Sequence, residues 1–284
     1  MSPARLVVFG ISFGALSGAL VAIALIRHPP SGTERTNVRG LLVPAVLGGP
    51  LVLAGVGVAL SAGSLALSPR IGGSVGGLCV ALGAAGFLDD VRGDRGARGF
   101  WGHLRAAGRG RVTTGLLKLL IGGAGGLAAG VAVADSWQVL TTALLVALSA
   151  KLFNLLDAAP GRAGKVGLAL WIPLLVWGSE GWAVSSAGML GALLVCLPLD
   201  LRERAMLGDA GANPLGAVLG LGLALALPSW TAATATVLLL GLNLSSELWS
   251  FSALIERVGP LRALDHLGRV RLPPPSPHDD ASAQ

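Results

Sequence analysis

Two adjacent carboxylates, Asp89 and Asp90, stand at the end of a long apolar run in the sequence. A charged side chain at bilayer depth costs roughly 2.5–3.5 kcal/mol, so acids at such a place need a reason. A carboxylate pair concentrates negative charge, which a hard divalent cation such as Mg²⁺ would neutralise while also binding phosphate oxygens. The alternative is a solvated helix end, but acids at a helix C-terminus oppose the macrodipole, which favours a functional role.

Two further polar signals come from other apolar runs. Asn154 and Asp157 are three residues apart, so on a helix they share one face and can bind the polar edge of a ligand. The competing interpretation is a helix cap followed by a turn. Lys118 stands one to two turns inside another run. It either reaches the lipid headgroups, as lysines near helix ends do, or balances phosphate charge beside the acids.

The segment 208–214 reads GDAGANP and contains Asp209 and Asn213. Its glycines let the backbone approach a ligand, and the start of a helix offers N–H groups to phosphate. An ordinary Asp cap is the alternative. Asn243 and Glu247 are four residues apart and share a helix face. A Glu in a membrane segment is a functional candidate by default, and a helix–helix hydrogen bond is the competing interpretation.

The elements that must position these groups are membrane helices. The chain has 284 residues, 53% hydrophobic and 13% charged, with a mean hydropathy of +0.72. Soluble domains carry about 25% charged residues, so the composition predicts an all-α, polytopic transmembrane helical bundle. Cys79 and Cys196 fall inside apolar runs and are interpreted as small buried hydrophobes. The four histidines have no metal-ligand spacing, so a zinc site is not expected.

The length of a span, roughly 20 apolar residues, divides the chain into about nine spans. They cover about 5–26, 41–61, 71–88, 112–134, 137–153, 165–178, 182–199, 213–228 and 230–250. A transmembrane catalytic-type domain is therefore predicted over residues 1–250. An amphipathic surface segment at 251–271 and a disordered Pro- and Asp-rich tail at 272–284 are predicted to follow it.

The basic residues predict the orientation of these spans. With alternating spans, all but two of the 21 Lys and Arg residues fall on one side, the exceptions being Arg5 and Arg70. The positive-inside rule makes that side cytoplasmic, which puts the N-terminus outside and the C-terminus inside. This accounts for the net charge of +6, so no nucleic-acid partner is expected. The polar signals described above all fall on the cytoplasmic side, which favours one shared site.

In order and topology these motifs resemble the polyprenyl-phosphate N-acetylhexosamine-1-phosphate transferases, which include the bacterial phospho-N-acetylmuramoyl-pentapeptide transferases and GlcNAc-1-phosphate transferases. That family has an Asp-Asp pair after the third span and a Lys in the next. An N-L-x-D-G-x-D-G loop follows the fifth span, and a G-D-x-G-S/A loop follows the seventh. The matching positions here are Asp89 with Asp90, Lys118, Asn154 with Asp157, and 208–211. Residues 33–49, with Arg39, Gly40 and Pro44, are more weakly similar to the family's first cytoplasmic loop. The resemblance covers about residues 10–250.

The resemblance implies a Mg²⁺-dependent reaction, with Mn²⁺ as an alternative, at the cytoplasmic face of the plasma membrane of a bacterium. A phospho-N-acetylhexosamine would move from a UDP-sugar to a polyprenyl phosphate such as undecaprenyl phosphate, releasing UMP, in cell-envelope glycan synthesis. Asp209 would be a metal ligand, and Asp89 and Asp90 would serve the metal and the polyprenyl-phosphate end. Lys118 would contact the phosphates, and Asn154 and Asp157 the nucleotide-sugar. Asn213 and Glu247 are substrate-binding candidates by their own positions in the sequence. Phosphoryl transfer needs this kind of charge neutralisation and in-line positioning.

The loop after the fifth predicted span departs from the family pattern. Pro160 stands at the place of the second acid, Ala158 replaces the first glycine, and Arg162 follows. The last cytoplasmic segment lacks the family's His cluster, and no tenth span is predicted. Because a guanidinium pairs naturally with phosphate, Arg162 is predicted to contact a donor phosphate, so Arg162→Ala would weaken donor binding more than acceptor binding.

Competing functional hypotheses remain open. One is the membrane phosphoglycosyl transferase, and another is a non-catalytic relative that acts as an envelope-assembly scaffold or binds a lipid phosphate. A small transporter is disfavoured, because the polar residues cluster at one face rather than at the bilayer midplane. Membrane lipids are expected partners, and a homodimer is an open alternative. If Asp89, Asp90 and Asp209 converge without a metal, either a carboxyl pKa must rise or a base such as Lys118 must approach.

Overall fold

The computed structural model describes residues 1–37, 39–64, 68–92 and 113–270, together with 102, 105, 106 and 108–111. The described part is all-helical, as predicted, with eleven helices and one short hairpin. The helices are α1 (Pro3–Arg27), α2 (Gly48–Ser64), α3 (Pro69–Arg92), α5 (Thr114–Val133), α6 (Gln138–Leu156), α7 (Arg162–Trp177), α8 (Glu180–Leu201), α9 (Asp209–Ala226), α10 (Ser229–Ser245), α11 (Phe251–Arg257) and α12 (Gly259–His266). The strands are β1 (Glu34–Thr36) and β2 (Leu42–Pro44).

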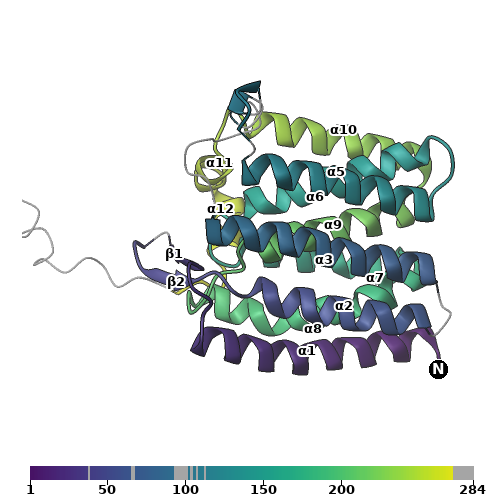
Figure 1. The fold of residues 1–284 in the computed structure, drawn as a ribbon, viewed down its shortest axis with the longest axis horizontal. Coiled ribbons are helices and arrows are strands. Elements are labelled where there is room, and N and C mark those ends of the chain that lie inside the picture. Colours follow the sequence, from purple (N-terminus) through teal and green to yellow (C-terminus); the bar gives the residue numbers. More distant parts are fainter. Residues whose placement is uncertain are drawn as a thin grey trace, which may run out of the picture.

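Six of the described helices are apolar and long enough to cross a membrane, namely α1, α3, α5, α6, α8 and α9. The apolar part of α2, Gly48–Ala62, is shorter. The long helices run side by side, with α1 at one edge of the bundle and α10 at the other (Figure 1). The chain therefore has the architecture of a helical membrane bundle. The count of about nine spans and the orientation in the membrane stay predictions.

The polar elements gather at one end of the bundle. The hairpin, α11 and α12 all lie there, on the left in Figure 1. We call this region the polar end, and it consists of residues 28–37, 39–47 and 246–270 with the adjoining ends of α3, α5, α6 and α9. The tail predicted to be disordered, 272–284, lies outside the described residues.

The predicted span at 41–61 is wrong in its first part. Residues 42–44 form β2, which pairs antiparallel with β1, and α2 begins only at Gly48. Pro44 explains the difference, because proline lacks the backbone N–H that a helix interior requires. The Pro44 carbonyl accepts a hydrogen bond from the backbone N–H of Met206 at 2.9 Å. The hairpin is thereby fixed to the segment that leads into α9.

Two other boundaries differ from the predicted spans in ways that affect the site. The span predicted from residue 213 begins earlier, because α9 starts at Asp209. The span predicted to end at residue 153 continues to Leu156 as α6. Asp209 and Asn154 are therefore fixed on helix ends rather than carried by loops.

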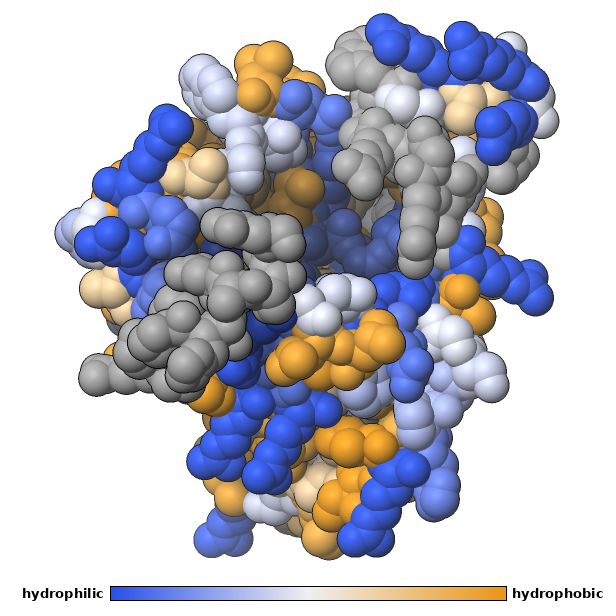
Figure 2. All heavy atoms as spheres, turned by 90° about the vertical axis from the view of Figure 1, so that its left-hand side faces the viewer, coloured by the Kyte–Doolittle hydropathy of each residue, from blue (hydrophilic) through white to orange (hydrophobic). Residues whose placement is uncertain are grey.

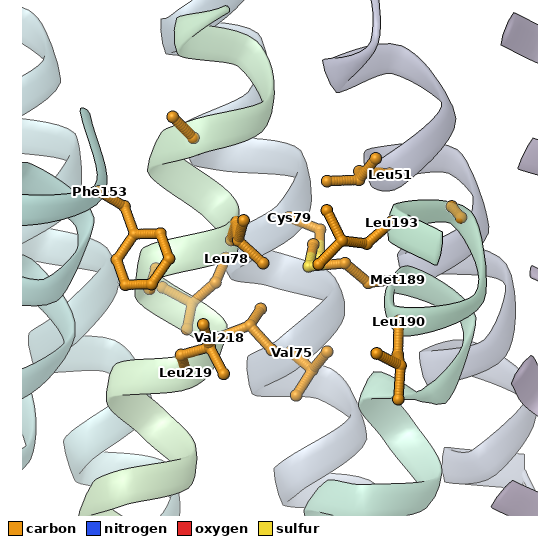
Figure 3. Packing of buried hydrophobic residues seen from close by; sticks show 14 of the residues in the cluster. Leu51, Val75, Leu78, Cys79, Phe153, Met189, Leu190, Leu193, Val218 and Leu219 are labelled. Atoms are coloured by element: carbon orange, nitrogen blue, oxygen red, sulfur yellow. The ribbon is translucent and has the colours of Figure 1, made fainter. Parts of the chain in front are cut away.

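The core lies between α3, α8 and α9. Val75 and Leu78 of α3 face Met189 of α8 and Val218 of α9 in the centre of the bundle (Figure 3). Cys79 and Cys196 are free and buried, which confirms their interpretation as small core residues.

Small residues allow α1 to pack closely against α8. The buried face of α1 carries glycines at every fourth position, Gly10, Gly14 and Gly18. A Cβ added to Gly14 would lie 2.1 Å from the carbonyl oxygen of Gly188 on α8. Such spacing lets two helix backbones touch, which is how helices associate where lipid removes the hydrophobic driving force.

Replacing Gly14 by alanine should therefore destabilise the protein by about 1–3 kcal/mol, the usual cost of overpacking a close contact. The matched control is Gly73→Ala on α3, where an added Cβ meets nothing within 4 Å. Alanine there should stabilise the helix by roughly 0.5–1 kcal/mol. Thermal unfolding in detergent measures both changes, and a Gly14→Ala variant as stable as the control would contradict the close packing of α1.

Candidate functional site

Three charged side chains from three helices meet at the polar end. Lys118, near the start of α5, donates to Asp89 Oδ2 at 2.6 Å and to Asp209 Oδ2 at 2.5 Å. Asp89 belongs to the last turn of α3, and Asp209 is the first residue of α9. The three side chains are only 16–22% exposed. Two of the three carboxylates predicted to share a cation, Asp89 and Asp209, thus converge on the Lys118 ammonium.

Two amides complete this cluster. Asn154 on α6 donates from Nδ2 to Asp209 Oδ1, so both oxygens of Asp209 are engaged. Asn213, one turn further along α9, is buried and donates to the main-chain oxygen of Asp209 at 2.8 Å. We call Asp89, Lys118, Asn154 and Asp209 the ion cluster. Each of these residues was singled out from the sequence, and their contacts join α3, α5, α6 and α9.

Asp90 has a different position from its neighbour. It is 6% exposed, and its carboxylate accepts from the backbone N–H groups of Asp209 at 3.1 Å and Ala210 at 2.9 Å. The first N–H groups of a helix lack partners within the helix. Asp90 supplies them from α3, so it caps α9 and positions Asp209. The structure places it beside the α9 backbone rather than beside Lys118.

Glycines allow this approach of α3 to α9. A Cβ on Gly86 would lie 2.3 Å from the main-chain oxygen of Asp209. Gly208 has a φ of 70°, in the left-handed region that favours glycine, and a Cβ there would lie 2.8 Å from Asp90 Oδ2. The glycines of the GDAG turn were predicted to admit a ligand. In the structure, Gly208 instead admits the carboxylate that caps α9.

A polar cavity of about 540 Å³ opens beside the ion cluster. Its lining combines four acids with two arginines, namely Asp89, Asp90, Asp157, Asp209, Arg35 and Arg92. Figure 2 views the polar end face-on and shows hydrophilic residues around a central hollow. The cavity therefore offers both carboxylates for a cation and guanidinium groups for an anion.

Arg35 and Arg92 are the lining residues that sequence reasoning missed. Both were counted only as cytoplasmic positive charges. Arg35 is in β1, and the hairpin brings it to the cavity. Arg92 ends α3, three residues after Asp89 and therefore one helical turn beyond it. The spacing from Asp89 could have predicted that Arg92 lies near the site. The position of Arg35 could not be predicted without knowing that the hairpin forms.

A second cavity of about 200 Å³ has Lys118 and Asn154 in its lining. Most of its lining is apolar and comes from α3, α5 and α6. Its polar lining residues are Lys118, Lys151, Asn154, Asn213 and Glu247. Lys118 and Asn154 therefore line the second cavity and also bind Asp89 or Asp209, which line the polar one.

Glu247 follows α10 and forms an ion pair with Lys151 at 3.4 Å. Glu247 lines the apolar cavity together with Lys118 and Asn154, so it lies near the ion cluster but is not one of its members. Asn243 is buried and donates to the carbonyl of Leu148 on α6 at 3.1 Å. For Asn243, the helix–helix hydrogen bond considered from the sequence is thus the arrangement observed.

Asp157 caps the C-terminus of α6 and lines the polar cavity. Its burial raises its pKa well above the ordinary value of 3.8, and the negative charges of Asp200, Asp209 and Asp90 raise this pKa further. The backbone N–H of Gly208 opposes the shift only in part. Asp157 is therefore poised to gain from a cation or a hydrogen-bond donor brought by a ligand.

Asp157→Asn should raise the thermal stability of the ligand-free protein at about pH 8, because it removes a charge that burial penalises. A carboxyl whose pKa is raised by folding contributes stability below its unfolded pKa and loses it as the pH rises through the folded pKa. The stability advantage of the variant should thus be small at about pH 4.5 and grow towards pH 8. Each kcal/mol gained in the free energy of unfolding should raise the melting temperature by roughly 2–4 °C. An advantage that shrinks as the pH rises would contradict the raised pKa of Asp157.

Arg162 is the one predicted substrate contact that the structure places elsewhere. It is 4% exposed and donates from Nε and Nη2 to both oxygens of Asp265 on α12, at 2.8 and 2.9 Å. Nη1 donates to Ser252 at 2.8 Å. Each of its guanidinium nitrogens has a protein partner, so Arg162 joins the C-terminal segment to the start of α7. We do not include it in the candidate site.

Asp265 also belongs to a group with metal-ligand spacing. Within the described part of the chain, ligand atoms of Glu256, Asp265 and His266 lie within 4.8 Å of one another. Arg162 and Arg269 already neutralise Asp265, at 2.8 and 2.6 Å. A cation there would compete with two guanidinium groups, just as a cation at the ion cluster would compete with the Lys118 ammonium.

Neither the comparison with protein-family models nor the comparison with curated proteins finds a match for this chain. The geometry of the ion cluster and its two cavities therefore carries the functional argument.

Proposed function

We propose that this chain is an integral-membrane transferase that moves a phospho-N-acetylhexosamine from a UDP-sugar to a polyprenyl phosphate. The observation that carries the proposal is the ion cluster, in which Asp89 and Asp209 line a polar cavity and bind Lys118, which lines a second, more apolar cavity. A soluble donor and a lipid acceptor need such a pair of neighbouring spaces. The reacting phosphates would meet where the two spaces adjoin.

The polar cavity suits a nucleoside diphosphate-sugar. Its volume of about 540 Å³ is in the range of ligand sites, about 300–1,000 Å³. Arg35 and Arg92 supply guanidinium groups, which match phosphate oxygens in geometry and charge. Asp157 supplies an acceptor for the hydroxyl and amide groups of a sugar or base.

The apolar cavity suits the lipid end of the acceptor. Most of its lining is apolar, and Lys118 and Asn154 are among its polar lining residues. An isoprenoid chain that approaches from the bilayer would bring its phosphate to the Lys118 ammonium. The same lysine would then face both substrates, which is the position from which it can neutralise charge on both.

The transfer needs no covalent bond to the protein. An oxygen of the lipid phosphate bonds to the phosphorus that carries the sugar, and the bond from that phosphorus to the bridging oxygen breaks. UMP leaves with that electron pair. Lys118 and the arginines lower the repulsion between two anionic reactants, and Asn154 holds Asp209 in place. Charge stabilisation and in-line positioning are the main requirements of phosphoryl transfer.

The chemistry of the donor set fits Mg²⁺. Asp89 and Asp209 present carboxylate oxygens from two helices towards one cationic position, and hard oxygen ligands are those that Mg²⁺ prefers. These two residues would hold the ion, with Asp90 fixing the backbone of Asp209. When bound, the ion would neutralise charge on the pyrophosphate. Lys118 would then turn from the carboxylates towards the phosphates.

Release of UMP tests the proposal. Purified protein with undecaprenyl phosphate and a panel of UDP-N-acetylhexosamines should release UMP when Mg²⁺ is present and stop when it is chelated. Omission of the lipid phosphate is the control, because hydrolysis would release UMP without it. If no sugar nucleotide in the panel yields UMP although undecaprenyl phosphate binds, the transferase assignment is wrong.

A second candidate function is supported by the ion pairing itself. Lys118 already pairs with both Asp89 and Asp209, so both carboxylates have a cationic partner without a metal. A non-catalytic relative that binds a lipid phosphate would need only the apolar cavity and the lysine. It would bind undecaprenyl phosphate with the same affinity whether or not Mg²⁺ is present.

A further inference from the structure

Segment 249–270 contacts the bundle through polar groups. Asp265 is its one fully buried side chain and binds Arg162 of α7 through both oxygens. Arg269 approaches the same carboxylate at 2.6 Å and donates from Nε to the carbonyl of Pro160 at 3.1 Å. The segment is thereby tied to the loop between α6 and α7.

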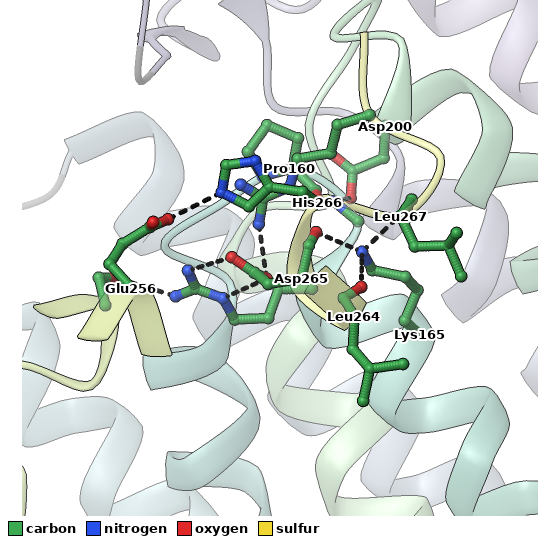
Figure 4. A network of polar contacts seen from close by, with 12 residues as sticks. Pro160, Lys165, Asp200, Glu256, Leu264, Asp265, His266 and Leu267 are labelled. Atoms are coloured by element: carbon green, nitrogen blue, oxygen red, sulfur yellow. Dashed lines mark hydrogen bonds and ion pairs between the residues drawn. The ribbon is translucent and has the colours of Figure 1, made fainter. Parts of the chain in front are cut away.

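Lys165 adds a second attachment. Its Nζ donates to three main-chain carbonyls at the end of α12, those of Leu264 at 2.9 Å, Asp265 at 2.5 Å and Leu267 at 3.1 Å (Figure 4). The last carbonyls of a helix lack partners within the helix, and a cation there also interacts favourably with the negative end of the macrodipole. We call Arg162, Lys165, Asp265 and Arg269 the clamp.

The apolar side chains of the segment, in contrast, do not pack into the core. Trp249 is 70% exposed, and Leu264 and Leu267 are 64% and 66% exposed. Leu254 and Leu261 are 51% and 43% exposed. The segment is therefore attached by its charges while its large hydrophobic groups remain open. An exposed apolar surface of this kind marks a site of contact with a membrane or a partner.

The distribution of side chains around α12 indicates that lipid covers the exposed apolar side chains of this segment. Leu261 and Leu264 are three residues apart and share one flank of the helix, and Arg262 and His266, four apart, share the other. Asp265 fixes the helix to the bundle. A helix with one apolar and one charged flank beside membrane spans has the pattern of an interfacial helix, in which the apolar flank enters the headgroup region.

The exposed surface of α10 continues into this segment. Leu240 and Leu244 are 45% and 58% exposed on α10, and Leu248 and Trp249 follow at 77% and 70%. A bundle edge of this composition faces lipid in a membrane protein. Trp at its end is typical of the headgroup level, where one side of the ring is apolar and the other is wet. The apolar band of α10 thus leads directly to the level of α11 and α12.

We propose that segment 249–270 lies on the surface of the lipid bilayer, with Leu261 and Leu264 in the headgroup region, and that the clamp sets its height on the bundle. The clamp connects this surface to Pro160 and so to the loop that carries Asp157. The lipid surface thereby positions one wall of the polar cavity. The inference is independent of the proposed reaction, because it concerns where the segment lies and not what the cavity transfers.

Site-directed spin labelling tests the position of the segment. Both cysteines are buried, so replacing them by alanine gives a background in which single cysteines can be placed at will. Leu264→Cys probes the apolar flank, and the neighbouring Ala263→Cys, which is exposed on another face, is the matched control. In phosphatidylcholine–phosphatidylglycerol vesicles, the ratio of oxygen to water-soluble nickel-complex collisions should be clearly higher at 264 than at 263. Equal ratios, with both labels open to the nickel complex, would overturn the proposal and favour a protein partner.

A second measurement keeps both native cysteines, so it can be made even if the cysteine-free protein fails to fold. Brominated lipids quench tryptophans at the headgroup level, so the full-length protein should lose part of its emission in such vesicles. Trp249→Phe should reduce the amount of emission that quenching removes, whereas Trp182→Phe, in the core, should leave that amount unchanged. An unchanged loss of emission in Trp249→Phe would also overturn the proposal.

Discussion

Asp209→Asn should abolish UMP release while leaving the bundle folded. One oxygen of Asp209 accepts from Lys118 and the other from Asn154, and its backbone is held by Asp90. The amide keeps the volume but removes the charge that a cation needs. Losses of about 10²-fold or more follow when a group that stabilises charge in a transition state is removed.

The matched control for this variant is Asp135→Asn, in the turn between α5 and α6 that is at the other end of α6 from Asn154. It should keep full activity. Circular dichroism and thermal unfolding should show that both variants retain the fold. An Asp209→Asn protein as active as Asp135→Asn would remove Asp209 from the mechanism.

Arg162→Ala should release segment 249–270 from the bundle. The change leaves Asp265, 5% exposed, without its bidentate partner. Breaking a buried ion pair from one side costs about 3–5 kcal/mol, and undocking lets Asp265 regain water. Hydrogen exchange in peptides from α11 and α12 should therefore become much faster, with little change in α8 and α9.

Arg257→Ala is the control for the clamp, because Arg257 is exposed in the same segment. It should leave the exchange of α12 unchanged. If Arg162 instead contacts a donor phosphate, as predicted from the sequence, Arg162→Ala should have a different effect. A selective loss of donor binding, with α12 still protected, would favour that contact over the clamp.

The membrane bundle and much of the ion cluster could be predicted because their causes are local or topological. Apolar runs of span length specify membrane helices wherever they occur. Asp89, Lys118 and Asp209 stand at the ends of different runs, and alternation of the spans puts those ends on one face. Their convergence then follows from packing of adjacent helices, as does the approach of Lys118 to the acids.

What could not be predicted depends on contacts between distant segments. Asp90 and Asp89 are identical in type and adjacent, and only the crossing of α3 over α9 turns one to the backbone and the other to Lys118. Arg162 binds a residue 103 positions away, which no local pattern reveals. The hairpin was hidden for another reason, because its strand β2 is apolar and continues directly into α2.

The most direct test of the central claim is the product of the lipid acceptor. Purified protein should convert undecaprenyl phosphate, in the presence of Mg²⁺ and the right UDP-N-acetylhexosamine, into a lipid-linked pyrophosphate sugar. Mass spectrometry should find this product and UMP in equal amounts, and neither with Asp209→Asn. Bound but unchanged undecaprenyl phosphate, with no product from any donor, would contradict the account and leave a lipid-phosphate binding protein.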